Sequence, residues 1–392
     1  MPSLSVGDFM NDGNELTGYR IIMAIGGSIS AYRTPDMIRE FRKRGAHVIP
    51  VVSNAASKII GIDAIQWAAD EKPITELTGE MEHINLFQNE NEITVLLVCP
   101  ATYNQIGKMA NGIADSVAET FFANAIGTNT RIVIVPAMHL EMYHNKIMER
   151  NLKTLMDMGV LIVEPRIEEG KAKIMWHEEI IDAILSEKQN EKSILIVSGK
   201  SHLEIDPVRS IINKSSGATG VMIAREAYRK GYRKITLIGN AEERIPLYCE
   251  IHDAVNVDDF YRITEELVSS NKYDDIIFPA ALSDFNTTKS KYKISGSDKQ
   301  ALELKPREKL ISIISSMNNA SGSRIVRFKL SQEKLSRSDS DSFMTVINYV
   351  GDSPYENGEN HYDIFIRNNK VYSGKLSKCE LAEKILVGLN GE

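Results

Sequence analysis

The sequence predicts an α/β protein with two doubly wound, Rossmann-like domains. Two apolar runs, residues 19–25 and 193–198, each lead directly into a turn that contains glycine and serine. Further apolar runs alternate with helical patterns in both halves, which is typical of parallel strands buried on both faces. The run SEKQNEK has no large apolar side chain and divides the halves. We therefore expect an N-terminal tail at 1–18, domains at 19–185 and 193–392, and a linker at 186–192.

In the first half, YRIIMAI and HVIPVV predict strands at 19–25 and 47–52. Between them Met37, Ile38 and Phe41 recur at helical spacing before Gly45, which suits the position just past a helix end. ITVLLVCPAT, TRIVIVPAM and GVLIVEP predict three more strands, and NQIGKMANGIADSVAETFFANAI and HEEIIDAIL predict helical segments.

The second half repeats this plan. SILIVSG, KITLIG and DDIIFPAALSDF predict strands, and Ala224, Ala227 and Tyr228 predict a helix that ends near Gly231. The last segment, NNKVYSGKLSKCELAEKIL, predicts a strand followed by a terminal helix.

Composition excludes several classes of function. The chain has 392 residues, 43% of them hydrophobic and 25% charged, so it can bury a core in each of two domains. A net charge of −7 disfavours binding to nucleic acid, which is itself negatively charged. No run approaches the roughly 18 apolar residues that a membrane helix needs. The first eighteen residues lack the basic and apolar parts of a secretory signal. Three scattered cysteines indicate neither a disulfide framework nor a zinc site. We expect a cytoplasmic protein that binds neither nucleic acid nor membrane.

The turn Gly26, Gly27, Ser28 is a candidate binding site. Doubly wound sheets bind ligands at the carboxyl ends of their strands, where a glycine-rich turn lets backbone N–H groups approach a phosphate. A tight turn without a ligand is an equally good interpretation of these three residues alone. A dinucleotide-dependent oxidoreductase is disfavoured, since neither half has a full G-x-G-x-x-G followed by a strand-end acid. The GKS at 199–201 lacks the upstream glycine of a P-loop.

The order of longer motifs carries a family resemblance. GGSISAYR, VVSNAAS, EHINL, PATYNQIGKMANGIADSV and PAMH follow the layout of flavoprotein cysteine decarboxylases. DPVRSIINKSSGATG, AALSDF, YKIS and RFKLSQE follow the layout of phosphopantothenate–cysteine ligases. A chain with both sets in this order resembles the bifunctional phosphopantothenoylcysteine decarboxylase/phosphopantothenate–cysteine ligase family of coenzyme A biosynthesis, in an archaeal-like form. The resemblance covers residues 19–185 and 193–331 well, and the last sixty residues loosely.

The resemblance implies a flavodoxin-like flavoprotein domain followed by a ligase domain. In the first domain FMN would oxidise the cysteinyl thiol to a thioaldehyde, so that carbon dioxide can leave, and the protein would supply orientation and a base. His83 matches the family's catalytic histidine, although a histidine taken by itself is more often structural or exposed. The flavin-binding positions implied are Gly26, Gly27, Ser28, Ser53, Ala101, Thr102, Asn104 and Asp115.

The chain departs from the decarboxylase pattern in two places. Met138 and His139 stand where the family has a Met-Asn pair whose amide holds the substrate carboxylate, and an imidazole can also donate a hydrogen bond. The stretch RIEEGKAKIM lacks the cysteine that many members carry in a flap. Lys171 or Lys173 could contact substrate phosphate there, and a solvated charged loop is the alternative.

In the ligase domain the resemblance implies an acyl-nucleotidyl intermediate of 4'-phosphopantothenate, which cysteine then attacks. The cosubstrate would be Mg²⁺ with CTP or ATP, and the residues that hold the metal are unknown. Asn213 and Lys293 would be catalytic. By composition alone Asn213 is more often a turn or helix-cap residue, but its place four residues after Arg209 in the motif reverses that preference. The implied substrate and nucleotide residues are Arg209, Ser215, Ser216, Gly217, Asp284 and Phe328.

The resemblance also implies a homo-oligomer, with trimers of the flavin domain and dimers of the ligase domain combining into a dodecamer. A second hypothesis is a flavin- or nucleotide-binding regulatory subunit that has lost catalysis. The retained His83, Asn213 and Lys293 oppose this alternative.

Overall fold

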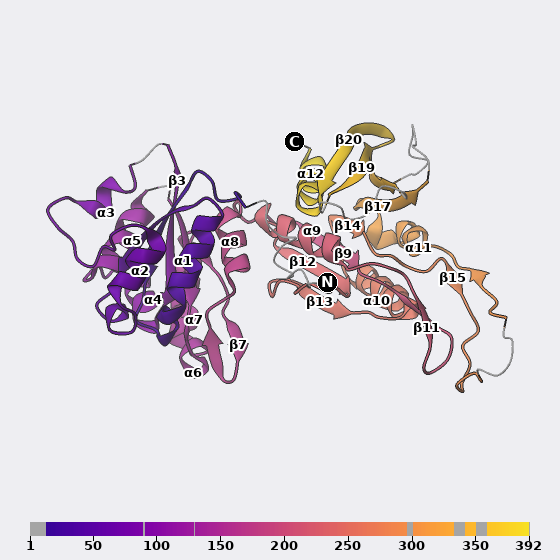
Figure 1. Ribbon diagram of the computed structural model, residues 1–392, viewed down its shortest axis with the longest axis horizontal. Coiled ribbons are helices and arrows are strands. Elements are labelled where there is room, and N and C mark those ends of the chain that lie inside the picture. The colour runs from indigo at the N-terminus through magenta and orange to yellow at the C-terminus, as the bar shows by residue number, and fades with distance from the viewer. Residues whose placement is uncertain are drawn as a thin grey trace. The chain divides into compact units, whose positions relative to one another are not determined.

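The computed structural model describes residues 13–88, 91–128, 130–295, 301–332, 342–349 and 359–391. The chain folds as two compact units, Met1–Leu185 and Ser186–Glu392 (Figure 1). Each is a twisted sheet with helices on both of its faces.

The sheet of the first unit has the strand order β2-β1-β3-β4-β6, and all of its strand pairs are parallel. This is the flavodoxin-like doubly wound order, whose switch point lies between β1 and β3. The strands are β1 (Tyr19–Ile25), β2 (His47–Val52), β3 (Ile93–Ala101), β4 (Arg131–Pro136) and β6 (Leu161–Ile162). The runs expected as strands form because their side chains are almost all buried between two helical layers.

Helices cover both faces of this sheet. Residues such as Ile22, Leu96 and Ile134 pack against α4 (Tyr103–Ala110), α5 (Val117–Gly127) and α7 (Lys146–Asp157). On the opposite face Met37 of α1 (Thr34–Lys43) contacts Cys99, whose sulfur lies 3.6 Å from the methionine sulfur. Helices α2 (Ile62–Ala69) and α8 (His177–Leu185) pack beside α1.

Short elements connect these layers. They are η2 (Ile29–Arg33), η3 (Ala56–Lys58), α3 (Glu82–Asn85), β5 (Met138–His139), α6 (Leu140–Tyr143), β7 (Arg166–Glu168) and β8 (Lys171–Lys173).

The long helical pattern at 104–126 forms two helices. Asn111 ends α4, and Gly112 adopts a φ of +68°, a conformation that favours glycine. The chain then runs through 111–116 before α5 begins. Asp115 therefore lies in a loop and not on a helix.

The sheet of the second unit has the order β13-β12-β9-β14-β17-β18-β19-β20. Its first six strands are parallel in the Rossmann order 3-2-1-4-5-6, and β19 and β20 add two antiparallel strands. The strands are β9 (Ser193–Ser198), β12 (Lys234–Gly239), β13 (Glu250–Asp253), β14 (Asp275–Phe278), β17 (Arg324–Ser331), β18 (Met344–Tyr349), β19 (Glu359–Ile366) and β20 (Asn369–Ser377).

The alternation of β9 shows how the helices are layered. Leu195 and Val197 join a core with α10 (Val257–Ser270) and α11 (Leu310–Ser316). Ile196 and Ser198 point the other way, toward α9 (Ala218–Arg229), where a Cβ on Gly220 would lie 2.1 Å from Ser198 Oγ. Helix α12 (Lys378–Asn390) packs on α9, and the strand and helix expected at the end of the chain are β20 and α12.

The remaining elements of this unit lie in its loops. They are two strand pairs, β10 (His202–Glu204) with β11 (Ser210–Ile212) and β15 (Phe285–Asn286) with β16 (Lys305–Pro306), and the short turn η4 (Asn318–Ala320).

Two segments differ from the tail and linker expected at 1–18 and 186–192. Within the described part of the tail, Leu16 is fully buried and its N–H donates to the carbonyl of Arg44 at 2.8 Å. In the linker segment, backbone N–H groups of Glu187 and Asn190 donate to the carbonyls of Arg229 and Gly231. Both segments pack against the protein because their N–H groups donate to backbone carbonyls at helix ends, which have no partner within the helix.

Candidate functional sites

Three strand ends of the first unit meet at the Gly26–Gly27–Ser28 turn. Gly26 N–H donates to the carbonyl of Pro100 at 3.0 Å, and Ser53 N–H donates to that of Ile25 at 3.2 Å. A Cβ on Gly26 would lie 2.5 Å from the Pro100 oxygen, and one on Gly27 would lie 2.3 Å from Ala55 Cβ. Only glycine permits this approach, which forms a cradle at the β1/β3 switch point.

The hydroxyls at this cradle are turn and helix caps. Ser28 Oγ accepts from Ser30 N–H at 3.4 Å, and Ser53 Oγ accepts from Ala56 N–H at 3.2 Å. Thr102 follows buried Ala101 and caps α4 in a capping box with Gln105. These groups are placed at the strand ends, as expected, and each also has a local structural partner.

Gln105 is a feature of the cradle that the sequence analysis missed. It is 4% exposed, and its Oε1 accepts from Thr102 N–H at 3.1 Å. Its Nε2 is buried and has no hydrogen-bond partner among the described residues. An unpaired buried amide is unfavourable, so a ligand with an acceptor atom fits this position. The capping-box spacing Thr-x-x-Gln was the available signal.

Two other predicted flavin residues lie on α4 and in the loop that follows it. Asn104 is exposed in the first turn of α4. Asp115 is exposed and pairs with Lys108 at 2.7 Å, and that hydrogen bond holds the pKa of Asp115 below its usual range.

His83 lies on α3, a short helix that packs against α5. Leu86 and Phe87 anchor this segment in the core, with the Phe87 ring centroid 6.0 Å from that of Phe121. The Nδ1 atom of His83 is buried and has no hydrogen-bond partner among the described residues. The imidazole therefore keeps an uncommitted ring nitrogen, as proton transfer requires.

Met138 and His139 form β5, the edge strand of a small three-stranded sheet whose other strands, β8 and β7, form a hairpin. Strand β8 pairs antiparallel with both β5 and β7, and its register sets Met138 opposite Ala172 and His139 opposite Lys171. His139 and Lys171 are exposed. Lys173, by contrast, pairs with Glu168 at 3.2 Å and with Glu169 at 2.8 Å.

In the second unit the Ser215–Ser216–Gly217 turn opens α9. The two hydroxyls accept from the N–H groups of Gly217 and Ala218, at 3.3 and 3.4 Å. Gly217 has a φ of +76°, and a Cβ there would lie 2.4 Å from the Asn240 carbonyl oxygen. Glycine is therefore required where the helix N-terminus, a site suited to anions, meets the loop after β12.

Arg209 and Lys293 are joined through Asp206. The Asp206 carboxylate accepts from the N–H groups of Val208 and Arg209 at 2.8 Å, and from Ile294 N–H at 3.1 Å. These bonds, led by Val208, hold the pKa of Asp206 below its usual range. The Arg209 guanidinium donates to Asp206 and to the Ile294 carbonyl, so it fixes the segment that carries Lys293. Lys293 itself is exposed.

A cavity of about 590 Å³ brings together three of the predicted ligase residues. Asn213, Asp284 and Phe328 all border it. Asn213 N–H donates to the carbonyl of Ser201 at 3.2 Å, and its Nδ2 donates to that of Leu282 at 3.4 Å. The volume and the mixture of polar and apolar groups in the wall suit a ligand the size of a nucleotide.

The same cavity carries cations that the sequence analysis did not single out. Lys309 pairs with Asp284 at 3.7 Å, and Arg327 and Lys329 of β17 border the cavity. Strand register was needed to find them, since RFKLS by itself shows no ligand pattern.

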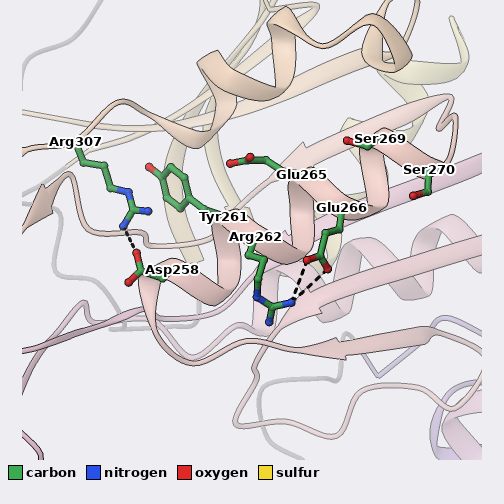
Figure 2. Close-up of a pocket in the computed structure, with 8 residues that line it drawn as sticks. All are labelled: Asp258, Tyr261, Arg262, Glu265, Glu266, Ser269, Ser270 and Arg307. Carbon is green, nitrogen blue, oxygen red and sulfur yellow. Dashed lines mark hydrogen bonds and ion pairs between the residues drawn. The ribbon is translucent and has the colours of Figure 1, made fainter.

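A second hollow of about 670 Å³ lies along α10 (Figure 2). Four of its charged side chains form two pairs in the view shown: Arg307 with Asp258 at 2.8 Å, and Arg262 with Glu266 at 3.3 Å. Tyr261 borders both this hollow and the cavity that Asn213, Asp284 and Phe328 line.

No group of three histidine, cysteine or acidic side chains arranged to hold a metal ion occurs within the described ranges. In the same part of the chain, no helix has the length and apolar character needed to cross a membrane.

Fold and sites together define a two-domain α/β protein with a candidate binding site at strand ends in each domain. Residues 10–189 match the family model described as "Flavoprotein", and residues 189–390 match the "DNA/pantothenate metabolism flavoprotein C-terminal domain".

Curated relatives match over most of the chain. The coenzyme A biosynthesis bifunctional protein CoaBC of Thermococcus kodakarensis is 35% identical over 95% of this chain and 94% of its own length. That of Haemophilus influenzae is 29% identical, over 95% of this chain and 97% of its own. The chain therefore belongs to the family of bifunctional coenzyme A biosynthesis proteins, which carry decarboxylase and ligase activities. The resemblance seen in the motifs is confirmed.

Solved structures match each half separately. An FMN-dependent cysteine decarboxylase, SpaF, is 26% identical, with a TM-score of 0.38 over 42% of this chain and 94% of its own. The C-terminal domain of a CoaBC protein is 22% identical, with a TM-score of 0.40 over 51% of this chain and 93% of its own.

Proposed function

We propose that the second unit joins cysteine to 4'-phosphopantothenate through an acyl-nucleotidyl intermediate, and that the first unit decarboxylates the product. CTP or ATP would serve as cosubstrate with Mg²⁺, which binds chiefly through phosphate oxygens and water and so needs no dedicated cluster of protein ligands. The observation that carries the proposal is the shared cavity of Asn213, Asp284 and Phe328, in a chain whose other unit has a glycine cradle at its switch point.

The cradle is proposed to hold FMN. Gly26 and Gly27 allow a phosphate to approach the backbone, and the unpaired Gln105 Nε2 offers a buried donor to an acceptor on the ring or chain of the flavin. When bound, FMN would supply the two-electron redox chemistry that the side chains lack.

Around that group the protein would orient substrate and move protons. His83 has an uncommitted Nδ1 and would act as the base. His139 and Lys171, exposed and opposite one another, would attract the anionic substrate under the β7–β8 hairpin.

In the ligase cavity Asn213 would stabilise the developing oxyanion with its amide, which brings no charge of its own. The Ser215–Gly217 turn and Lys293 would face phosphate oxygens. We further propose that the protein works in the cytoplasm as a homo-oligomer, a dodecamer built from trimers of the first unit and dimers of the second.

The test uses the full chain in two separate assays. Purified protein should carry a flavin absorption spectrum, ligate cysteine to 4'-phosphopantothenate only with nucleotide, and release carbon dioxide from phosphopantothenoylcysteine. His83→Asn should keep the flavin spectrum and the ligation rate while carbon dioxide release falls by about 10² to 10⁴. A protein that binds flavin and nucleotide but turns over neither substrate would support the regulatory-subunit hypothesis instead.

A further inference from the structure

Strand β17 carries two basic side chains into the ligase cavity. Arg327 and Lys329 are two residues apart, so they share one face of the strand. The register places Phe278 of β14 and Thr345 of β18 on either side of Arg327. Phe278, Arg327 and Thr345 all border the cavity, so its lining continues across three neighbouring strands at Arg327.

Arg327 is half-buried, and its side chain has neither a hydrogen bond nor an ion pair within the described residues. Lys309 across the cavity is different, because it already pairs with Asp284. The nitrogen atoms of Arg327 keep contact with solvent in the cavity, so the guanidinium is an uncommitted cation that can receive an anionic group without first breaking an ion pair. The arrangement is therefore suited to a ligand that brings an anion to this point.

The rest of the wall indicates what kind of ligand carries that anion. Charged lining is limited to Asp284, Lys309, Arg327 and Lys329, which leaves a positive excess. Tyr261, Phe278 and Phe328 give one part of the wall an aromatic character that suits a flat base. A flat, partly apolar ligand with several negative charges is the chemistry of a nucleotide.

We propose that Arg327 is a phosphate-binding residue of the ligase cavity, and that it makes the cavity prefer nucleotides with more phosphate groups. A guanidinium presents a planar fork of donors that matches two phosphate oxygens at once. The inference rests on the proposed function for the role of the nucleotide as cosubstrate. It adds a specific contact that neither the motif pattern nor the family membership assigns.

The experiment compares nucleotide binding by the full chain and by Arg327→Gln, using CTP, CMP, ATP and inorganic pyrophosphate as titrants in calorimetry. Loss of one charge-assisted contact should weaken CTP and pyrophosphate binding by about 10- to 100-fold and CMP binding by much less. The difference between the two proteins should shrink as salt is raised. Arg327→Lys should recover part of the affinity, since it restores the charge without the fork.

Arg262→Gln is the matched control. Its exposed guanidinium on α10 pairs with Glu266 (Figure 2) and also with Asp259, so CTP affinity should stay within about twofold of the unchanged protein. Equal melting temperatures for the variants would show that folding is preserved.

Two outcomes separate this inference from the proposed function. If Arg327→Gln binds CTP and pyrophosphate as tightly as the unchanged protein, or raises only the KM for 4'-phosphopantothenate, the assignment is overturned while the ligase function stands. If the unchanged protein binds pyrophosphate and Arg327→Gln weakens that binding, but no nucleotide supports ligation, the proposed ligase function is overturned and the phosphate contact is supported. Absence of all nucleotide and pyrophosphate binding would overturn both.

Discussion

His139 of β5 lies directly opposite Lys171 of β8 in an antiparallel pair. Side chains directly opposite in such a pair have Cβ atoms about 5 Å apart and lie on the same face. Two basic groups therefore stand together at the strand end where the family places an asparagine. Lys173, two residues further, is held by Glu168 and Glu169.

We expect Lys171→Gln to raise the KM for phosphopantothenoylcysteine by about 3- to 10-fold with little change in kcat. The reason is that the exposed Lys171 ammonium would attract the anionic substrate without taking part in the chemical step. Steady-state carbon dioxide release at two salt concentrations would measure this. Lys173→Gln is the control and should leave KM nearly unchanged. His139→Asn should stay active because it keeps a donor, whereas His139→Ala should not. Equal KM values for the two lysine variants would contradict the assignment.

Gln105→Glu tests the unpaired amide at the cradle. The change keeps Oε1 as an acceptor for Thr102 N–H and replaces the Nε2 donor with an oxygen. We expect FMN affinity to fall about tenfold or more, because an acceptor on the ligand would then face another acceptor. Fluorescence titration with FMN would measure the change. Gln66→Glu, an exposed position on α2, should bind FMN normally, and normal binding by Gln105→Glu would remove Gln105 from the site.

Asp206 should make the stability of the ligase unit depend on acid. Its folded-state pKa is lowered, chiefly by the Val208 N–H, so the ionised carboxylate stabilises the fold above the ordinary Asp range of about pH 4. That stabilisation is lost as pH falls through the lowered pKa. We expect Asp206→Asn to melt earlier than the unchanged protein at pH 7, with the gap closing in acid.

Thermal unfolding followed from pH 7 to about pH 3 would check this sign, with the exposed Asp253→Asn as a control that shows no such trend. Because Asp206 also holds Ile294 N–H, the variant should raise the KM for nucleotide through the neighbouring Lys293. A gap in melting temperature that widens in acid would contradict the argument.

The sequence predicted the parallel strands well because residues such as Ile22, Leu96 and Ile196 lie in short continuous apolar runs, which only a sheet covered on both faces buries. It did not predict the break at Gly112, because a single glycine is tolerated inside a helical pattern and gives no sign of its φ.

The site was predicted only where local motifs carry it. Asn213, Asp284 and Phe328 stood in long motifs, and the fold brings them to one cavity. Arg327 and Gln105 depend on strand register and on burial, which are tertiary properties. From the local sequence alone, a basic residue in a strand or a glutamine in a helix is expected to be an exposed side chain, because such residues are mostly exposed in proteins.

Asn213→Asp tests the chemistry of the ligase unit directly. The side chain borders the cavity, and its Nδ2 donates to the Leu282 carbonyl at 3.4 Å, so it lies beside the strand end that also carries Asp284. The substitution is nearly isosteric, but it exchanges a neutral donor for a negative charge against an anionic intermediate. In other enzymes the loss of one oxyanion donor lowers kcat by about 10² to 10³.

We therefore expect nucleotide binding by Asn213→Asp to remain, the acyl-nucleotide to accumulate, and little product to appear after cysteine is added. Mass spectrometry of quenched reactions would show this, with the exposed Asn318→Asp as the matched control. A variant that ligates cysteine at the parental rate would show that the Asn213 amide does not act on the reacting group, and the cavity would then hold its nucleotide through the cations of its wall alone.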